Sequence, residues 1–188
     1  EISELIHDAV LLPVSSILAP FPGFVREYSR TTGKHVEFVT EGDEIEVDRR
    51  ILDSLRDPFM HLIHNSIDHG IEYPDLRAAS GKPLKGRVRI RVFAMSGSKV
   101  GIEVCDDGAG IDSRKIREAA VRTGVITAKE EAGLSDMEAL WLIFRSGLST
   151  SELITEISGR GLGLAIVEDT VTRLGGYVTL SSEIGKGT

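Results

Sequence analysis

The sequence predicts an α+β fold, a two-layer α/β sandwich with helices on one face of a mixed β-sheet. Three observations lead to this prediction. Apolar residues recur at helical spacing on both sides of the chain's centre, whereas residues 87–105 alternate as the two strands of a hairpin do. The order of helices, hairpin, helices and strands is mixed along the chain. Arginines at positions 87, 89 and 91 indicate that the outer sheet face meets solvent.

Composition narrows the class of protein. The chain has 188 residues, of which 41% are hydrophobic and 27% charged, as in an ordinary soluble domain with a real core. The net charge of −7 and the lack of a basic run argue against a nucleic-acid partner. Cys105 is the only cysteine, which excludes a disulfide framework and fits a reducing cytoplasm. No apolar run is long enough for a membrane span, so we expect no membrane contact by this domain.

The elements in the first third of the chain are predicted from the spacing of its apolar residues and from its helix-breaking prolines. Residues 1–12 have helical spacing, and we expect residues 1–10 to be the end of a preceding helix and residues 11–188 to be a separate domain. After prolines at positions 13, 20 and 22, we expect a helix over residues 21–30 and a strand over residues 35–40. Residues 48–55 are predicted to form a short helix.

Residues 57–72 form the stretch around which the chain is organised. Asp57 is expected to cap a helix that has Pro58 at its first position and stops near Gly70. Its apolar residues fall on one side, and a polar stripe falls on the other: His61, Asn65, Asp68 and Glu72, with His69 at the edge. This stripe is either a solvated helix face or a binding surface. Asn65 favours a binding surface, because asparagine is a mediocre helix former and its side-chain oxygen is a suitable ligand for Mg²⁺.

The rest of the chain alternates between turns and regular elements. We expect a loop over residues 73–86, the hairpin, and a helix over residues 113–122 capped by Asp112 or Ser113. A capping-box spacing at Ser135 predicts a helix ending near Phe144. Residues 145–158 are rich in Ser, Thr and Gly and are predicted to form a mobile loop. A glycine-rich box at residues 159–163 should open a helix that reaches residue 174. A strand over residues 177–182 and a final glycine turn complete the prediction.

The most informative motif begins at Asp106, where the second hairpin strand ends. A carboxylate followed by Gly108 and Gly110 places a hydrogen-bond acceptor beside backbone that a flat ring can approach. An acceptor at this place would favour the exocyclic amine of adenine over the carbonyl of guanine. The alternative is an ordinary Asp-Asp-Gly turn, and this motif alone has low specificity.

The box at residues 159–163 has the character of a phosphate-binding loop, since its amides can face an anion at a helix N-terminus. Its spacing excludes a P-loop and disfavours a dinucleotide fold. A glycine-rich helix entry within a lid is the alternative. Lys115 could reach a phosphate, although a solvated lysine is the simpler interpretation. The turn at residues 185–188 carries little information alone.

Taken together and in this order, the four motifs resemble the ATPase superfamily of gyrase, heat-shock chaperones, histidine kinases and MutL (GHKL), which has the Bergerat fold. Several segments resemble the chemotaxis histidine kinases of the CheA type in particular. These are His-Asn-Ser-Ile-Asp-His-Gly-Ile-Glu at 64–72, Ser-Gly-Lys-Pro at 80–83, Asp-Asp-Gly-Ala-Gly-Ile-Asp at 106–112 and Ser-Gly-Arg-Gly at 158–161. Leu-Ala-Ile-Val at 164–167 and Gly23 depart from the usual chemotaxis pattern.

The resemblance implies ATP and Mg²⁺ as cofactors and assigns residue roles. Asn65 would ligate Mg²⁺, His61 and His69 would lie near the phosphates, and Thr188 would share a water with Asp106. Residues 145–158 would form a lid. The implied nucleotide contacts are Asp106, Gly108, Gly110, Lys115, Ser158, Gly159, Gly161, Leu162, Gly163 and Thr188.

The resemblance also implies partners: a histidine phosphotransfer domain of the same protein, dimerisation and receptor-coupling domains, and a response regulator. Two other functions compete with a histidine kinase. One is an ATP-hydrolysing clamp of the gyrase, chaperone or MutL kind, in which a glutamate base stands four residues before the asparagine. Here that position is His61. The other is a degenerate interaction module without catalytic activity. The intact Asn65, Asp106 and glycines argue against this function.

Overall fold

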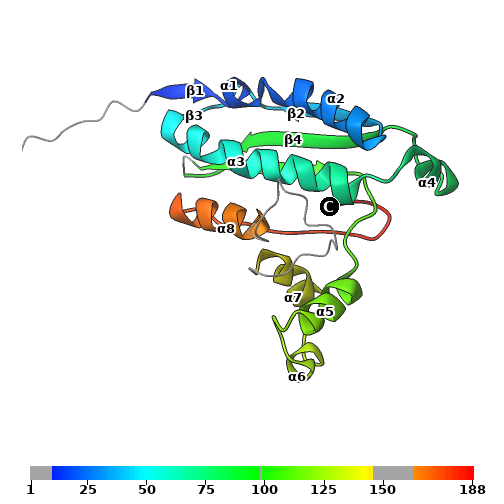
Figure 1. Ribbon diagram of the computed structural model, residues 1–188. Coiled ribbons are helices and arrows are strands. Elements are labelled where there is room, and N and C mark those ends of the chain that lie inside the picture. The colour runs from blue at the N-terminus through cyan, green and yellow to red at the C-terminus, as the bar shows by residue number, and fades with distance from the viewer. Residues whose placement is uncertain (1–9, 98, 146–162) are drawn as a thin grey trace, which may run out of the picture.

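The computed structural model describes residues 10–97, 99–145 and 163–188 (Figure 1). Its main sheet has three strands in the order β2 (Val36–Glu41), β4 (Gly86–Ala94) and β5 (Val100–Asp106). Strands β2 and β4 are parallel, while β4 and β5 form the antiparallel hairpin. The sheet is therefore mixed, as predicted.

The two faces of the sheet differ in chemistry. Along β4, Val88, Ile90 and Val92 are buried. The arginines that alternate with them face outward and pair with three glutamates of the neighbouring strands, namely Glu37, Glu41 and Glu103. The alternation of polar and apolar residues in the hairpin thus predicted both faces correctly.

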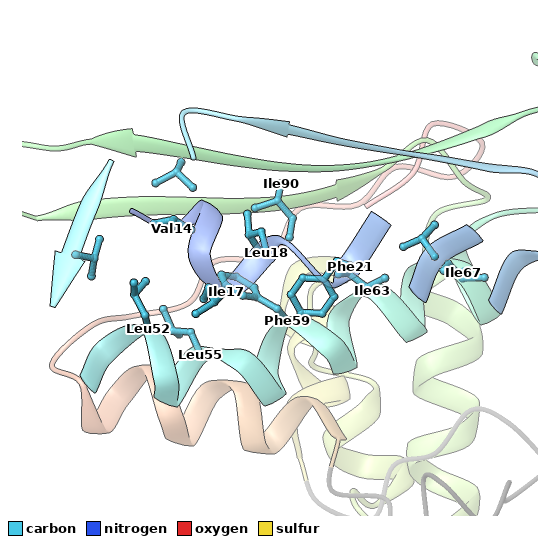
Figure 2. Close-up of a cluster of buried hydrophobic side chains, with 13 residues drawn as sticks. Val14, Ile17, Leu18, Phe21, Leu52, Leu55, Phe59, Ile63, Ile67 and Ile90 are labelled. Atoms are coloured by element: carbon cyan, nitrogen blue, oxygen red, sulfur yellow. The ribbon is translucent and has the colours of Figure 1, made fainter. Parts of the chain in front are cut away.

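Helices α1 (Ser15–Leu18), α2 (Phe21–Thr32) and α3 (Arg49–Asn65) cover the apolar face. Figure 2 shows their side chains meeting Ile90 of the sheet in one hydrophobic cluster. The cluster includes Val14, Ile17, Leu18, Phe21, Leu52, Leu55, Phe59, Ile63 and Ile67. This arrangement confirms the predicted two-layer sandwich.

Helix α3 begins nine residues before the predicted first helical residue, at Arg49 instead of Pro58. The Asp48 side chain caps it by accepting from the Arg50 amide at 2.8 Å. The expected short helix and the organising helix are one element, with Pro58 buried inside it. Proline removes one hydrogen bond of a helix, but the apolar stripe of Leu52, Leu55 and Phe59 continues across this position and packs into the core.

The prediction of a helix through residue 12 was wrong. Strand β1 (Leu11–Pro13) pairs antiparallel with β3 (Glu46–Asp48), immediately before α3. The remainder of that predicted helix, residues 1–9, lies outside the described residues. The predicted loop over residues 73–86 contains a further helix, α4 (Pro74–Ala79), which has proline at its first position.

A second group of helices lies apart from the sheet (Figure 1). It consists of α5 (Ser113–Arg122), α6 (Ala128–Glu131) and α7 (Asp136–Trp141), followed by the 3₁₀ turn η2 (Leu142–Phe144). Ile116, Ala120 and Leu142 belong to its own small core. The caps predicted at Asp112 and Ser135 are both present.

Helix α8 (Gly163–Arg173) runs beside α3 on the side away from α2 (Figure 1). The predicted strand over residues 177–182 is absent from this described part of the chain, where only an isolated bridge joins Glu183 to Gly187. Tyr177 is 72% exposed, so alternation there does not reflect burial against a sheet. The predicted lid over residues 145–158 lies outside the described residues except for Arg145. Within the described ranges, no helix has both the length and the apolar character needed to cross a bilayer.

Candidate nucleotide-binding site

Three segments that are distant in sequence meet at one end of the sheet. They are the π-helical turn η1 (Ser66–Gly70) after α3, the turn after β5, and the C-terminal residues 182–188. The Ala109 amide donates to the Gly70 carbonyl at 2.8 Å, and the Asp106 amide donates to the Thr188 carbonyl at 2.9 Å. These bonds unite three of the four predicted motifs. A π-turn of this kind is often found at functional sites.

The glycines of the site allow the three backbones to approach closely. A Cβ atom on Gly108 would overlap the Gly70 carbonyl, and one on Gly187 would overlap the Asp106 carbonyl. Gly110 has φ of +71° and faces the Glu183 carbonyl in the same way. The predicted role of Gly108 and Gly110 was to admit a flat ring. The structure shows that they are also required for packing of backbone against backbone.

Two adjacent aspartates point to different sides of the turn. The Oδ1 atom of Asp106 accepts from the Gly108 amide at 2.9 Å, and its carboxylate would lie 2.9 Å from a Cβ atom on Gly70. Asp107 points instead to Arg77, with 2.9 Å between its Oδ2 and Nη2 of the guanidinium. Asp106 is thus the carboxylate that lies among the three segments, and its predicted contact with a base stays a prediction.

Burial perturbs the Asp106 carboxyl. Loss of hydration raises its pKa, while hydrogen bonds from the Gly108 amide and the Ser66 hydroxyl act in the opposite direction without cancelling the effect. A desolvated acceptor at the end of a strand is well suited to select a ligand by its hydrogen-bond donors.

Asn65 and His61 form a pair on the last turns of α3. Nδ2 of Asn65 lies 2.8 Å from Nε2 of His61. The amide nitrogen can only donate, so His61 accepts at Nε2 and carries its proton on Nδ1. Burial and the charges of His64 and His69 lower the pKa of His61, which favours the neutral ring that this bond needs. The bond leaves Oδ1 of Asn65 without a donor among the described residues.

The π-turn is fixed from behind by Lys34 and Tyr28. The Lys34 ammonium donates to the carbonyls of Ile67 at 2.6 Å and Asp68 at 2.7 Å, and the side chain is only 7% exposed. The Tyr28 hydroxyl donates to Asp68 at 2.7 Å, and burial together with this bond raises the pKa of Tyr28 to about 12. Sequence reasoning assigned neither residue a role, since nothing in their local spacing points to helix α3.

The structure therefore brings together part of the predicted site. Six predicted residues line the meeting point or the end of α3: His61, Asn65, Asp106, Gly108, Gly110 and Thr188. The Thr188 hydroxyl lies 2.9 Å from that of Ser182, a partner that sequence reasoning did not identify. His69 is exposed on the π-turn, Lys115 is exposed on α5, and Gly163 begins α8. Ser158, Gly159, Gly161 and Leu162 lie outside the described residues.

The fold is shared with a family of ATPases. The family described as histidine kinase-, DNA gyrase B- and HSP90-like ATPase matches residues 54–188, and the chain belongs to this family. Within that family it is similar to a gliding motility protein and to chemotaxis proteins. It is 48% identical over 187 residues to the gliding motility regulatory protein of Myxococcus xanthus and 42% identical over 187 residues to the chemotaxis protein CheA of Bacillus subtilis.

Both matches cover 100% of this chain but only 24% of the Myxococcus protein and 28% of the Bacillus protein. Two solved structures share the fold. One is full-length ShkA in complex with AMPPNP, with a TM-score of 0.55 and 20% identity, covering 95% of this chain and 30% of that one. The other is the histidine kinase domain of a blue-light-activated kinase from Erythrobacter litoralis, with a TM-score of 0.53 and 15% identity, covering 94% and 58%.

Proposed function

We propose that this chain is the ATP-binding catalytic domain of a CheA-type histidine kinase. In this reading it transfers the γ-phosphoryl group of Mg-ATP to a histidine on a separate phosphotransfer domain. The observation that carries the proposal is the extent of the similarity: the ATPase family matches from residue 54, whereas CheA proteins match along the whole chain. The proposal implies a cytoplasmic setting, dimerisation and receptor-coupling domains in the same protein, and a response regulator downstream.

The Asp106 carboxylate is proposed to recognise the base. It accepts hydrogen bonds, so an adenine amine directed at it is matched, whereas the guanine carbonyl at that ring position is repelled. The surrounding backbone is packed by Gly70 and Gly108, and this packing holds the acceptor in place. Discrimination of adenine from guanine therefore follows from one carboxylate.

Asn65 is proposed to ligate Mg²⁺ through Oδ1, since the amide oxygen is its only possible ligand atom and the bond from Nδ2 to His61 orients the amide. No group of three or more histidine, cysteine or acidic side chains is placed to hold a metal among the described residues. A single amide oxygen suits Mg²⁺, which keeps several waters and takes further ligands from substrate phosphates. When bound, the ion would neutralise charge on the transferred group.

The position of His61 favours a kinase over an ATP-hydrolysing clamp. In clamp-type relatives the resemblance places a glutamate here, as a base for water. In this chain the position carries an imidazole with a lowered pKa that is bonded to Asn65. A proton acceptor occupied in this way does not activate water, so the nucleophile should arrive from a partner domain.

The test is phosphotransfer from radiolabelled ATP with and without the phosphotransfer domain of the same full-length protein. We expect slow hydrolysis by the chain alone and labelled acceptor when the domain is added. Asn65→Ala should reduce transfer by on the order of 10²-fold, the scale of losing one preorganised electrostatic contact. Ser54→Ala, on the exposed side of α3, is the matched control. Rapid phosphate release without acceptor, or full transfer by Asn65→Ala, would refute the proposal.

A further inference from the structure

A group of charged side chains lies behind the Asp106 turn and has no part in the proposed chemistry. It consists of Glu72, Arg77, Lys82 and Asp107, here called the Arg77 cluster. Arg77 is 0% exposed, although it carries a charge at every physiological pH. Burying a guanidinium is costly because it loses its hydration, and partners around it offset that cost only when the geometry is good. A fully buried arginine is therefore expected to have a specific structural or functional role.

The three guanidinium nitrogens of Arg77 make four hydrogen bonds to three separate segments. Nη1 donates to Oε2 of Glu72 at 2.9 Å and to the Asp107 carbonyl at 3.2 Å, and Nη2 donates to Oδ2 of Asp107 at 2.9 Å. Nε donates to the Pro83 carbonyl at 2.7 Å. The guanidinium thus joins the segment after the π-turn, the segment after α4 and the turn after β5.

Lys82 completes the cluster from the same side. Its ammonium donates to Oε1 of Glu72 at 2.7 Å and to two successive carbonyls, those of Asp107 at 3.0 Å and Gly108 at 2.7 Å. Two cations and two carboxylates balance in charge. Burial alone would raise the pKa of Glu72, but the hydrogen bonds from Lys82 and Arg77 and the charge of Lys82 lower it instead.

The consequence of the cluster is geometric. Lys82 holds the carbonyls of Asp107 and Gly108 on the outer side of the turn, and Arg77 holds the Asp107 carboxylate there. With these groups fixed outward, the Gly108 amide is left pointing to Oδ1 of Asp106. A buried ion pair contributes little net stability, but it selects one arrangement over its competitors in some systems.

We infer that Arg77 and Lys82 are positioning residues that set base recognition by fixing the turn at residues 106–109, with Glu72 as their shared anchor. This inference rests on the proposed function, in which Asp106 meets the adenine amine. It assigns a role to the segment over residues 74–83, which sequence reasoning treated as a loop. The residues act through Asp106 and do not contact the base themselves.

The test uses Lys82→Met and Arg77→Met, with Arg91→Met as the matched control. Arg91 pairs with two glutamates on the outer sheet face and is half exposed, so its loss removes a charge without touching the turn. Lys82 is partly exposed and its variant should fold even if Arg77→Met does not. Calorimetric titrations with ADP and GDP are performed below the melting temperature of each variant.

We expect ADP affinity to fall roughly tenfold in Lys82→Met, the size of one charged hydrogen bond, with GDP affinity nearly unchanged. A smaller ratio of ADP affinity to GDP affinity indicates that Lys82 positions the turn. Loss of folded protein would instead lower the apparent affinity for both nucleotides equally. Equal losses for both nucleotides, or an unchanged ratio, would overturn the inference.

Hydrogen exchange on the nucleotide-free protein separates this inference from the proposed function. The amides of Gly108 and Ala109 should exchange faster in Lys82→Met, while those of β2 keep their protection. This measurement needs no ligand, so it stands even if the wild-type chain fails to bind ADP. Unchanged protection at these two amides would show that the cluster does not hold the turn.

Discussion

Asp106→Asn separates recognition of the base from folding more cleanly than any other single change. The substitution keeps the size of the side chain and converts one of its two acceptor atoms into a donor. One oxygen remains to accept from the Gly108 amide, as Oδ1 does now at 2.9 Å. The new amide group then opposes the adenine amine, so two donors face each other in a desolvated site.

The expected loss follows from leaving a buried donor unsatisfied, which costs about 1–3 kcal/mol. At 1.4 kcal/mol per factor of ten, ADP affinity should fall about 5- to 150-fold. The measurement is calorimetric titration of ADP and GDP at pH 7. The matched control is Asp53→Asn, which removes an exposed carboxylate that pairs with Arg49 elsewhere on α3. An ADP-to-GDP affinity ratio equal to that of the wild type would refute base recognition by Asp106.

Stability should move in the opposite direction to affinity. Burial raises the pKa of Asp106 above its ordinary value of 3.8, so the folded state disfavours the ionised carboxyl. A group with a raised pKa stabilises the fold below its unfolded pKa, and that contribution is lost as pH rises through the folded pKa. At pH 7 the ionised side chain is therefore unfavourable, and Asp106→Asn should melt at the same temperature as the wild type or higher. The difference should disappear below pH 4. A variant that melts much lower at pH 7 would contradict this account.

Two further predictions concern the frame of the site. Gly108→Ala should destabilise the fold by about 1–3 kcal/mol in urea titrations, because its Cβ would overlap the Gly70 carbonyl. Gly133→Ala, whose nearest neighbour would be 3.7 Å away, should be close to neutral, and equal effects of the two would contradict the packing described here. Glu72 has a lowered pKa, so it stabilises the fold above its ordinary value of 4.5 and loses that effect as pH falls. Glu72→Gln should therefore reduce the fall in melting temperature between pH 5 and pH 3. If the melting temperature of the variant fell as steeply as that of the wild type over this range, the stabilising role of Glu72 would be contradicted.

The sequence predicted those parts of the site that depend on local chemistry. Asp106 follows a strand whose alternation was clear, and Asn65 stands on a helix with a clear apolar stripe, so both could be placed before the fold was known. The start of that helix was misjudged at Pro58, because proline at the first helical position is a strong local signal. Continuous burial of Leu52, Leu55 and Phe59 outweighs it in the folded protein.

The supporting residues could not be predicted, because their partners are far away in sequence. Arg77 reaches Asp107 across 30 positions, and Lys34 reaches Ile67 across 33. The residues around each of them do not indicate which distant partner the side chain will meet. The predicted strand at residues 177–182 failed for a related reason: alternation implies a strand only where a neighbouring strand and a buried face exist, and Tyr177 has neither in the described structure.

Helix α3 has a mechanical consequence because of what is attached to each end. At one end, the Arg49 amide donates to the Val10 carbonyl at 2.9 Å, and β1 pairs with β3 directly before the helix. At the other end stand Asn65 and the π-turn. The helix has 17 residues, which at 1.5 Å per residue makes a stiff rod of roughly 25 Å. Residues 10–13 and Asn65 are therefore held at opposite ends of one helix, so its length fixes the separation between the β1–β3 pair and the proposed metal ligand.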